Sequence, residues 1–320
     1  MYFNKKNSFL HGIMFHNFHD NKIHPYSQGS LDKFDLKKLI NFVGVENIVN
    51  PNEFIQLIKN KDFNLKKVCL TFDDGILSQL DIALPILNKY NLKAFFFPHT
   101  AIFINKTDNL ELFRYFRNSS YKKIDNFYND FFSSTGKNLD QFFLKYKKVI
   151  KIKKEKHSCY SINDIKFRLV RDFMLSKNEY NKIMFSLFKK KMFNYKKVSK
   201  NLFIKKSQLK KIYNSGHVIG LHSHTHPTRI EKKNFNEQLL EYNKNISLLS
   251  KILNIEKNDI KSAAHPSGSY NSNTKKIFKL KKIQLAFKEI MTKDDKTHKI
   301  NNSIFEVARE DASNIMANLK

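Results

Sequence analysis

Cysteine and acidic residues are scarce in this sequence, and long apolar runs are missing from it. Two cysteines, Cys69 and Cys159, are too few to build a disulfide framework. No stretch approaches the roughly 18–20 continuous apolar residues of a membrane span. The N-terminal residues Met1–Asn7 lack the apolar segment of a signal peptide. These absences together predict a soluble cytoplasmic protein.

Negative charge is the next shortage, because 29 acidic residues face 58 basic ones and leave a formal charge of +29. The excess is mostly lysine and is spread over the whole chain, which favours a solvated surface. Peripheral attraction to an anionic membrane or glycan stays open as an alternative. With 320 residues, 30 Phe and 13 Tyr, the chain can bury the core of one large α/β domain or of two smaller ones.

Apolar segments of strand length alternate with segments of helical periodicity along most of the chain. Strands are expected at 12–15, 67–72, 94–97, 217–221, 260–264 and 284–287, with a last segment at 305–311, and helices at 32–42, 51–60, 76–90, 207–215, 234–254 and 272–282. Ser207 is a plausible N-cap for the fourth of these helices. This alternation predicts a parallel α/β sheet, either open or closed into a barrel.

Residues 103–202 differ in character, since lysine runs interleave with Phe and Tyr. We interpret them as a helical, Lys/Phe-rich insertion within a single domain that spans 1–320. Basic and aromatic residues together can bind nucleic acid. Aromatic residues at helical spacing are more often core, so no nucleic-acid partner is expected.

Two adjacent carboxylates, Asp73 and Asp74, follow the short apolar run that begins at Val68, in which Cys69 is a small core residue. An ionised carboxylate at the mouth of a buried strand loses hydration unless a positive group receives it. A divalent metal ion is the obvious receiver.

Three histidines in five residues, His222, His224 and His226, follow another predicted strand. In a helical turn, His222 and His226 would project from one face and bind a single ion, while His224 would point elsewhere. Parallel α/β folds gather their strand C-termini at one face, which would bring these histidines to the carboxylates. An aspartate with two histidines suits a catalytic ion such as zinc, with cobalt, nickel or manganese as alternatives. The carboxylate that does not bind metal is then placed to take a proton from water, which is the chemistry of amide or ester hydrolysis.

These motifs resemble those of the polysaccharide deacetylase (NodB-homology) family, carbohydrate esterase family four. Thr71–Gly75, TFDDG, is similar to the family's first motif, and His222–Pro227, HSHTHP, is similar to its second. The resemblance covers 66–100 and 203–290. It implies a distorted (β/α) barrel of seven or eight strands and a metal-dependent deacetylase. It also implies that Asp73 is the general base, that Asp74, His222 and His226 bind the metal, and that Ser223 hydrogen-bonds within the histidine loop.

The third family motif departs from its usual form, because Ala264-His265-Pro266-Ser267-Gly268 lacks the arginine that normally steadies the catalytic aspartate. The late segment Val307–Asp311 resembles an ending with arginine and aspartate seen in some members. We therefore expect Arg309, oriented by Asp311, to replace that arginine. The backbone N–H of Ser267 would help to hold the carbonyl oxygen, and His265 and Tyr270 would face the substrate.

The C-terminal motif that normally supplies the general acid is not evident either. A subset of the family takes this acid from the end of an N-terminal strand, and Met14-Phe15-His16 is similar to that pattern. His16 is therefore the expected acid, with His11, His19 and His265 as rivals, and His298 a poor candidate in a polar stretch.

The expected function is removal of an acetyl group from an N-acetylated sugar or glycan in surface polysaccharide or lipopolysaccharide biosynthesis. Two alternatives stay open. One is hydrolysis of a non-sugar C–N bond on the same barrel, and the other is a non-catalytic binding protein on a decayed deacetylase fold. The sequence does not define the oligomeric state.

Overall fold

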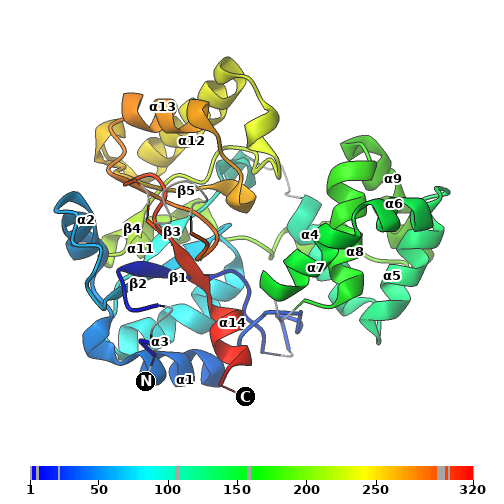
Figure 1. Ribbon diagram of the computed structural model, residues 1–320, viewed down its shortest axis with the longest axis horizontal. Coiled ribbons are helices and arrows are strands. Elements are labelled where there is room, and N and C mark those ends of the chain that lie inside the picture. The colour runs from blue at the N-terminus through cyan, green and yellow to red at the C-terminus, as the bar shows by residue number, and fades with distance from the viewer. Residues whose placement is uncertain are drawn as a thin grey trace.

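The computed structural model describes residues 2–4, 7–20, 22–104, 109–156, 160–293, 300–301 and 303–319. Cys159 and His298 lie outside these residues. Figure 1 shows two parts, a barrel that contains both termini and a lobe of helices beside it.

Seven strands of the described residues form the barrel, and all of their pairings are parallel. They are β1 (His11–Phe15), β2 (Val68–Asp73), β3 (Phe95–Phe97), β4 (Val218–Ile219), β5 (Ser262–Ala264), β6 (Leu285–Phe287) and β7 (Arg309–Asp311). Five of them form a sheet in the order β4-β3-β2-β1-β7, and β5 pairs with β6. The single bridges Leu221↔Ala263 and Phe287↔Val307 join the two sheets. The seven strands therefore follow one another around a distorted barrel, which is the predicted fold class, with two narrow seams.

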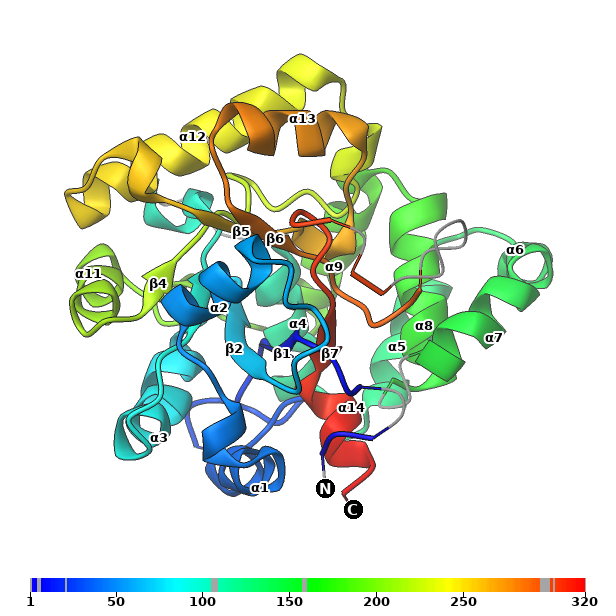
Figure 2. The same ribbon diagram turned by 60° about the vertical axis from the view of Figure 1, so that its left-hand side comes forward.

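Helices surround the barrel on its outside, and one helix, at Pro51–Lys59, lies across its end (Figure 2). They are α1 (Lys33–Val43), α2 (Pro51–Lys59), α3 (Leu84–Lys89), α11 (Lys206–Asn214), α12 (Phe235–Leu253), α13 (Ser272–Leu280) and α14 (Ala312–Ala317). Short 3₁₀ turns are η1 (Val45–Asn47), η3 (Thr100–Ile104), η5 (Ile230–Lys232), η6 (Lys257–Asp259) and η7 (Pro266–Gly268), and η2 (Gln79–Ala83) is a π-helical turn. None of the described helices is long and apolar enough to cross a membrane.

Side chains of the central strands alternate between two apolar layers, because successive residues of a strand point to opposite faces. Leu70 and Phe72 pack toward the outer helices, whereas Cys69 belongs to a cluster with Phe95 and Phe97 that fills the barrel. Asp73 continues the inward series of Cys69, and its β3 partner is Phe97. The strand order thus delivers a carboxylate to the inner rim at the C-terminal edge of the barrel.

Two predicted helices begin differently from their sequence expectation. The segment expected as one helix over 76–90 opens with the π-helical turn η2, and the α-helix starts only at Leu84. Ser207 lies inside α11, whose N-cap position is Lys205. Both differences concern helix starts, where local propensity is weak and neighbouring loops decide the boundary.

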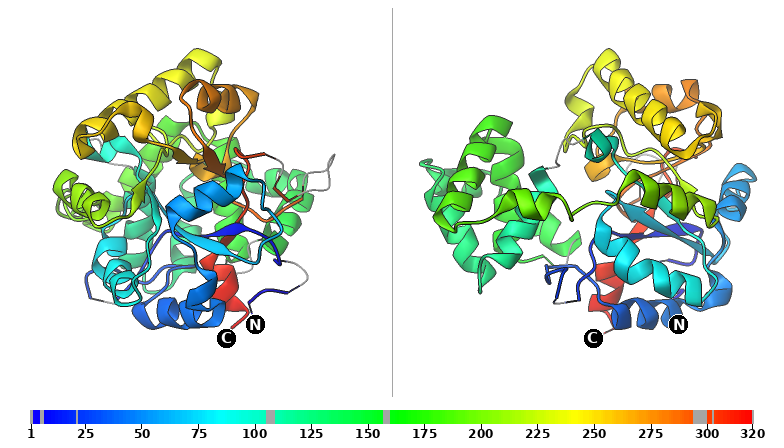
Figure 3. Two further views of the ribbon diagram at one scale, coloured as in Figure 1. Left: turned by 90° about the vertical axis from the view of Figure 1, so that its left-hand side faces the viewer. Right: turned by 180° about the vertical axis from the view of Figure 1, so that it is seen from behind.

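The described residues between β3 and α11 include seven α-helices, which form the helical lobe (Figure 3). They are α4 (Asn109–Ser119), α5 (Ile124–Ser133), α6 (Leu139–Lys145), α7 (Lys147–Lys156), α8 (Ile162–Leu169), α9 (Lys177–Lys190) and α10 (Tyr195–Ser199), with the π-helical turn η4 (Val170–Met174) after α8. Phe116, Phe127, Phe131 and Phe167 are buried in a core cluster of the lobe. These aromatic side chains are therefore packing residues rather than an exposed stacking surface.

Candidate active site

Asp73 and Arg309 form a buried ion pair at the end of β2. The Nη1 and Nη2 atoms of Arg309 donate to Oδ1 and Oδ2 of Asp73 at 2.8 Å each. Asp73 is 2% exposed and Arg309 is 1% exposed. Burial would raise the pKa of Asp73, but the charge of Arg309, with His222 and His16, outweighs burial and holds this pKa below its ordinary value. The carboxylate is therefore ionised although it is buried.

Arg309 lies on β7, which pairs with β1 and not with β2. Its side chain therefore crosses β1 to reach Asp73 at the end of β2. Gly12 of β1 pairs with Arg309, and a Cβ on Gly12 would lie 2.9 Å from Cγ of Arg309. The absence of a side chain there leaves room for the arginine stem. Arg309 Nε donates to the Lys288 carbonyl at 3.0 Å, and Nη1 also donates to Thr71 Oγ1 at 3.2 Å. These bonds fix the guanidinium plane against the carboxylate.

Asp311 has a different place from the one expected, because it caps helix α14. Its Oδ1 accepts from the backbone N–H of Ser313 at 2.8 Å. Among the described contacts of Arg309, none involves Asp311. The expectation that Asp311 orients Arg309 is therefore wrong, since a helix starts directly after β7 and takes this carboxylate as its N-cap.

Asp74, His222 and His226 converge on one point, in a buried position. Oδ1 of Asp74 lies 3.3 Å from Nε2 of His222 and 3.2 Å from Nε2 of His226. One potential ligand atom from each residue lies within 4.8 Å of the others. Asp74 Oδ1 is buried and has no hydrogen-bond partner. One carboxylate oxygen and two imidazole nitrogens are the ligand atoms of a typical divalent metal site. A buried carboxylate oxygen that accepts no hydrogen bond also needs a positive partner, which such an ion would supply.

The backbone of the histidine segment is a loop and not the helical turn that the spacing suggested. Ser223 and His226 both have positive φ, at 60° and 50°, which breaks helical continuity. The Ser223 hydroxyl accepts from the N–H of His226 at 3.2 Å, as the family resemblance implied. Two left-handed residues therefore bring His226 back toward His222.

Side chains of α12 and a backbone carbonyl of β5 hold this loop from behind. His222 Nδ1 lies 2.9 Å from the Ala264 carbonyl, which leaves Nε2 to face Asp74. Asn245 Oδ1 accepts from the N–H of His222 at 3.0 Å, and Glu241 Oε2 accepts from the N–H of His224 at 3.0 Å. His224 points away from the site, as predicted, and its Nδ1 lies 2.8 Å from Thr100 Oγ1.

His16 lies at the end of β1, on the other side of Asp73. Its Nε2 is 3.9 Å from Asp73 Oδ2, and its side chain is 34% exposed. Gln79 Nε2 donates to the carbonyls of His16 and Asp73, at 2.8 Å and 2.6 Å, and so ties the two strand ends together. Sequence reasoning missed this role of Gln79.

Other histidines named as rivals of His16 have structural partners. His11 is buried at the opposite end of β1 and bonds Tyr2 Oη at 2.7 Å. His19 bonds Ser30 Oγ at 2.9 Å. His265 Nε2 bonds the Phe305 carbonyl at 2.8 Å, and burial lowers the pKa of His265 to about 4. A histidine that is neutral at physiological pH is a poor proton donor, which favours His16.

The third-motif residues lie along the rim of the site. Ser267 is exposed and has φ 51°, and it lines the same cavity as His265 and Tyr270. The Tyr270 ring stacks on His265 with centroids 4.1 Å apart. Tyr270 therefore both supports His265 and forms part of the cavity wall.

His99 is a further buried histidine that sequence reasoning missed. Its ring centroid lies 5.6 Å from that of His226. Burial, reinforced by the charge of His226, lowers the pKa of His99 to about 3. His99 therefore packs behind Asp74, His222 and His226 as a neutral group. The sequence offered one indication of this place, namely that His99 follows a predicted strand.

A cavity of about 530 Å³ opens over the site, within the usual size range for small-ligand pockets. The described barrel residues on its wall include His16, Asp73, Asp74 and His226. The opposite wall is formed by the helical lobe, from α4, α7, α8 and η4. The lobe therefore completes the pocket, which the sequence alone did not show.

A parallel α/β barrel with a carboxylate–histidine set and a second, separately paired carboxylate at its strand ends is built like a barrel hydrolase. More specifically, the chain belongs to the polysaccharide deacetylase family. The sequence profile of that family, described as "Polysaccharide deacetylase", matches residues 60–122 and 174–286, more than half of the chain. No curated protein matches the sequence.

Solved structures with the same fold cover nearly the whole chain. The Streptococcus pyogenes deacetylase PplD in complex with acetate has a TM-score of 0.52 at 17% identity and covers 98% of both chains. IcaB from Ammonifex degensii has a TM-score of 0.55 at 14% identity, with 98% of this chain and 97% of that chain covered. The BpsB deacetylase domain from Bordetella bronchiseptica has a TM-score of 0.51 at 12% identity, with 95% and 96% covered. At these identities the likeness concerns the fold.

Proposed function

We propose that this protein hydrolyses the acetamido group of an N-acetylated sugar or glycan and releases acetate, in surface polysaccharide or lipopolysaccharide biosynthesis. The observation that carries the proposal is the juxtaposition of two adjacent carboxylates with different partners. Asp74 faces two histidines, whereas Asp73 is paired with Arg309 and borders the same cavity. Two carboxylates in such different surroundings can take two different roles.

Asp74, His222 and His226 would hold a divalent ion, with zinc the first choice and cobalt, nickel or manganese as alternatives. When bound, such an ion polarises a carbonyl oxygen and lowers the pKa of water. His222 is held in one orientation by the Ala264 carbonyl, so its Nε2 is directed into the site.

Asp73 is assigned the role of general base. Because its pKa is held low, the carboxylate is ionised near neutral pH and can accept a proton from the attacking water. Both oxygens of Asp73 accept from Arg309, so the group cannot swing toward Asp74. The arginine thus positions the base beside the metal-ligand set, with Asp73 Oδ2 4.0 Å from His222 Nε2.

His16 is assigned the role of general acid that protonates the departing amine. It reaches the cavity beside Asp73, and its exposure gives it access to solvent protons. Ser267 and Tyr270 border the space in which the acetamido group would lie. The backbone N–H of Ser267 is our candidate for holding the carbonyl oxygen as charge develops on it.

Acetate release from N-acetylated sugars tests this function. The wild-type protein loaded with zinc should release acetate, and Asp73→Asn should abolish release while the bound metal stays near the wild-type level. Asp140→Asn, an exposed carboxylate on the lobe, is the matched control and should leave the rate unchanged. Undiminished release by Asp73→Asn would refute the assigned base. Metal binding without turnover on any acetylated compound would favour the non-catalytic alternative.

A further inference from the structure

Arginine is rare in this chain, and every arginine lines the same cavity. Only six of the 58 basic residues are arginine, and all six border the cavity over the active site. They are Arg114, Arg117, Arg168, Arg171, Arg229 and Arg309. Among the described lining residues there is a single lysine, Lys153. The basic residues outside the cavity are therefore all lysines, and arginine occurs only at the cavity wall.

Four of these arginines belong to the helical lobe and lie across the cavity from the barrel. Arg114 and Arg117 are on α4, Arg168 is on α8 and Arg171 is in η4. Arg309 has a task of its own with Asp73, but these four make no contact with the catalytic carboxylates among the described interactions. Their concentration on one wall needs a separate explanation.

Acidic partners hold the lobe arginines in fixed orientations. Asp164, which is 1% exposed, lies 2.6 Å from Arg168 Nε and 3.1 Å from Arg117 Nη1. Arg171 bonds Asp172 through Nε and Nη2 at 2.7 Å each, and Arg114 Nε bonds Glu111 at 2.6 Å. These bonds pre-organise the guanidinium groups before any ligand arrives, which lowers the entropic cost of binding.

Donor capacity remains after these pairs are formed. A guanidinium carries five N–H donors. The described hydrogen bonds use one of these donors in Arg168, at Nε, and two in Arg171, at Nε and Nη2. Nε of Arg117 is buried and has no hydrogen-bond partner among the described residues, whereas its Nη1 is taken up by the ion pair with Asp164. One carboxylate, Asp164, is shared by two arginines, so this part of the wall has an excess of positive charge. Glu289 on the barrel side acts electrostatically on Arg168 but makes no described hydrogen bond to it.

Aromatic rings orient two of these arginines further. The guanidinium of Arg168 lies 4.1 Å from the Tyr160 ring centroid, and that of Arg117 lies 5.0 Å from the Phe167 centroid. Stacking of this kind is a property of the planar guanidinium that a lysine ammonium cannot reproduce. Fork-like recognition of anionic oxygens is another such property.

We propose that the lobe wall binds a phosphate group, so that the substrate is an N-acetylated sugar carrying a phosphate or diphosphate. This inference rests on the proposed deacetylase function. Several fixed guanidinium groups match an anion with more than one charge and several oxygens. A cavity of about 530 Å³ can hold a sugar and a phosphate together. The acetamido group would lie toward the barrel and the phosphate toward α8.

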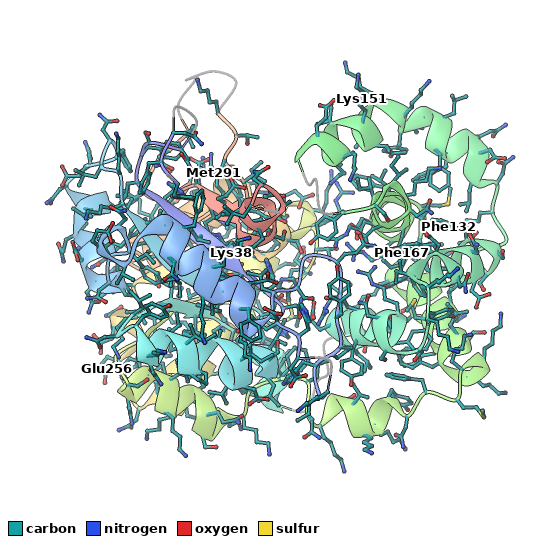
Figure 4. The ribbon with its side chains drawn as sticks, turned by 90° about the horizontal axis from the view of Figure 1, so that it is seen from below. Lys38, Phe132, Lys151, Phe167, Glu256 and Met291 are labelled. Carbon is teal, nitrogen blue, oxygen red and sulfur yellow. The ribbon has the colours of Figure 1, made fainter. Side chains whose placement is uncertain are left out.

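Binding of inorganic pyrophosphate tests the phosphate site without any turnover. Titration calorimetry compares the wild-type protein with Arg168→Gln and Arg168→Lys, and with Lys151→Gln as the control. Lys151 is exposed at the outer edge of the lobe, away from Phe167, so the control removes one charge without touching the cavity (Figure 4). We expect Arg168→Gln to weaken binding by about tenfold or more, as for loss of a charged hydrogen bond, with Arg168→Lys in between.

Equal affinity in the wild type and Arg168→Gln would overturn the site, because pyrophosphate would then be bound elsewhere, for example by the metal ion. An equal loss in Lys151→Gln would also overturn it, since the attraction would then come from the general basic charge.

Acetate release then distinguishes the source of the phosphate. The substrates compared are N-acetylglucosamine, its 1-phosphate, a nucleoside diphosphate N-acetylglucosamine and a polyprenyl diphosphate N-acetylglucosamine. The proposal predicts a lower KM for at least one phosphorylated sugar, and Arg168→Gln should remove most of that difference. Equal KM values for neutral and phosphorylated sugars would contradict it. If no sugar releases acetate, the deacetylase proposal fails, and the pyrophosphate titration still decides the phosphate site.

Discussion

The ion pair between Arg309 and Asp73 gives the sharpest prediction for a single substitution. Both groups are almost fully buried, and two hydrogen bonds of 2.8 Å join them. Replacing Arg309 by Met would leave the Asp73 carboxylate buried and unpaired. Removing one partner of such a pair typically costs about 3–5 kcal/mol, so the free energy of unfolding near neutral pH should fall by that amount.

The pH dependence of this loss has a defined sign. In the wild type the pKa of Asp73 is lowered, so its pairing contributes stability above the unfolded-state pKa, and that contribution is lost as the pH falls through the folded-state pKa. In Arg309→Met, burial is no longer outweighed by the arginine and raises the pKa, so acidification relieves the unpaired charge. The stability gap between the two proteins should therefore narrow on acidification.

Urea unfolding followed by circular dichroism measures this gap at several pH values. Arg309→Lys, which keeps a charge but loses the two-pronged contact, should fall between the wild type and Arg309→Met. The double variant Arg309→Met with Asp73→Asn should lose less than the sum of the single losses, because no buried charge is left unpaired. A loss below about 1 kcal/mol, the value typical of an exposed pair, would refute the reasoning, as would a gap that is constant with pH.

Two further predictions concern His16 and Asp164. His16→Gln should lower kcat for acetate release by about 10²–10⁴-fold, the usual contribution of a general acid, while metal content is unchanged; a rate within a few-fold of wild type would exclude His16 as the acid. Burial opposes ionisation of Asp164, but its two arginines lower its pKa from 3.8 to about 2. The ionised Asp164 carboxylate therefore stabilises the fold above about pH 3.8, and this contribution is lost as the pH falls to about 2. The stability deficit of Asp164→Asn should consequently shrink by roughly 2 kcal/mol over that pH range. Urea unfolding at each pH measures that deficit, and a constant value would show that Asp164 is not ionised in the fold.

Much of the barrel follows from the sequence because its strands are short apolar runs at regular intervals. Asp73 and Asp74 were expected to meet the histidines because parallel strands end at the same edge, and Asp74 does lie beside His222 and His226. The contact between Arg309 and Asp73 could be proposed only from the resemblance of the segment Val307–Asp311 to the ending of some family members. The strand order that allows it, with β7 next to β1, could not be predicted from periodicity.

Loop geometry and the position of the lobe were beyond sequence reasoning. Ser223 and His226 adopt left-handed conformations in a loop that α12 holds through the backbone of His222 and His224, so a helical turn was the wrong expectation. The arginines of the lobe belong to amphipathic helices whose polar faces look alike in sequence. One signal was present, namely the rarity of arginine against the many lysines, and it would have marked Arg168 and its neighbours as special.

The location of the bound ion tests the central claim most directly. Crystals of the zinc-loaded protein, measured at the zinc absorption edge, should show one anomalous peak between Asp74, His222 and His226, with Asp73 bonded to Arg309 and not to the ion. The same peak should persist in Asp73→Asn and disappear in Asp74→Asn. A peak coordinated by Asp73, or no peak at this group of residues in fully loaded protein, would contradict the account.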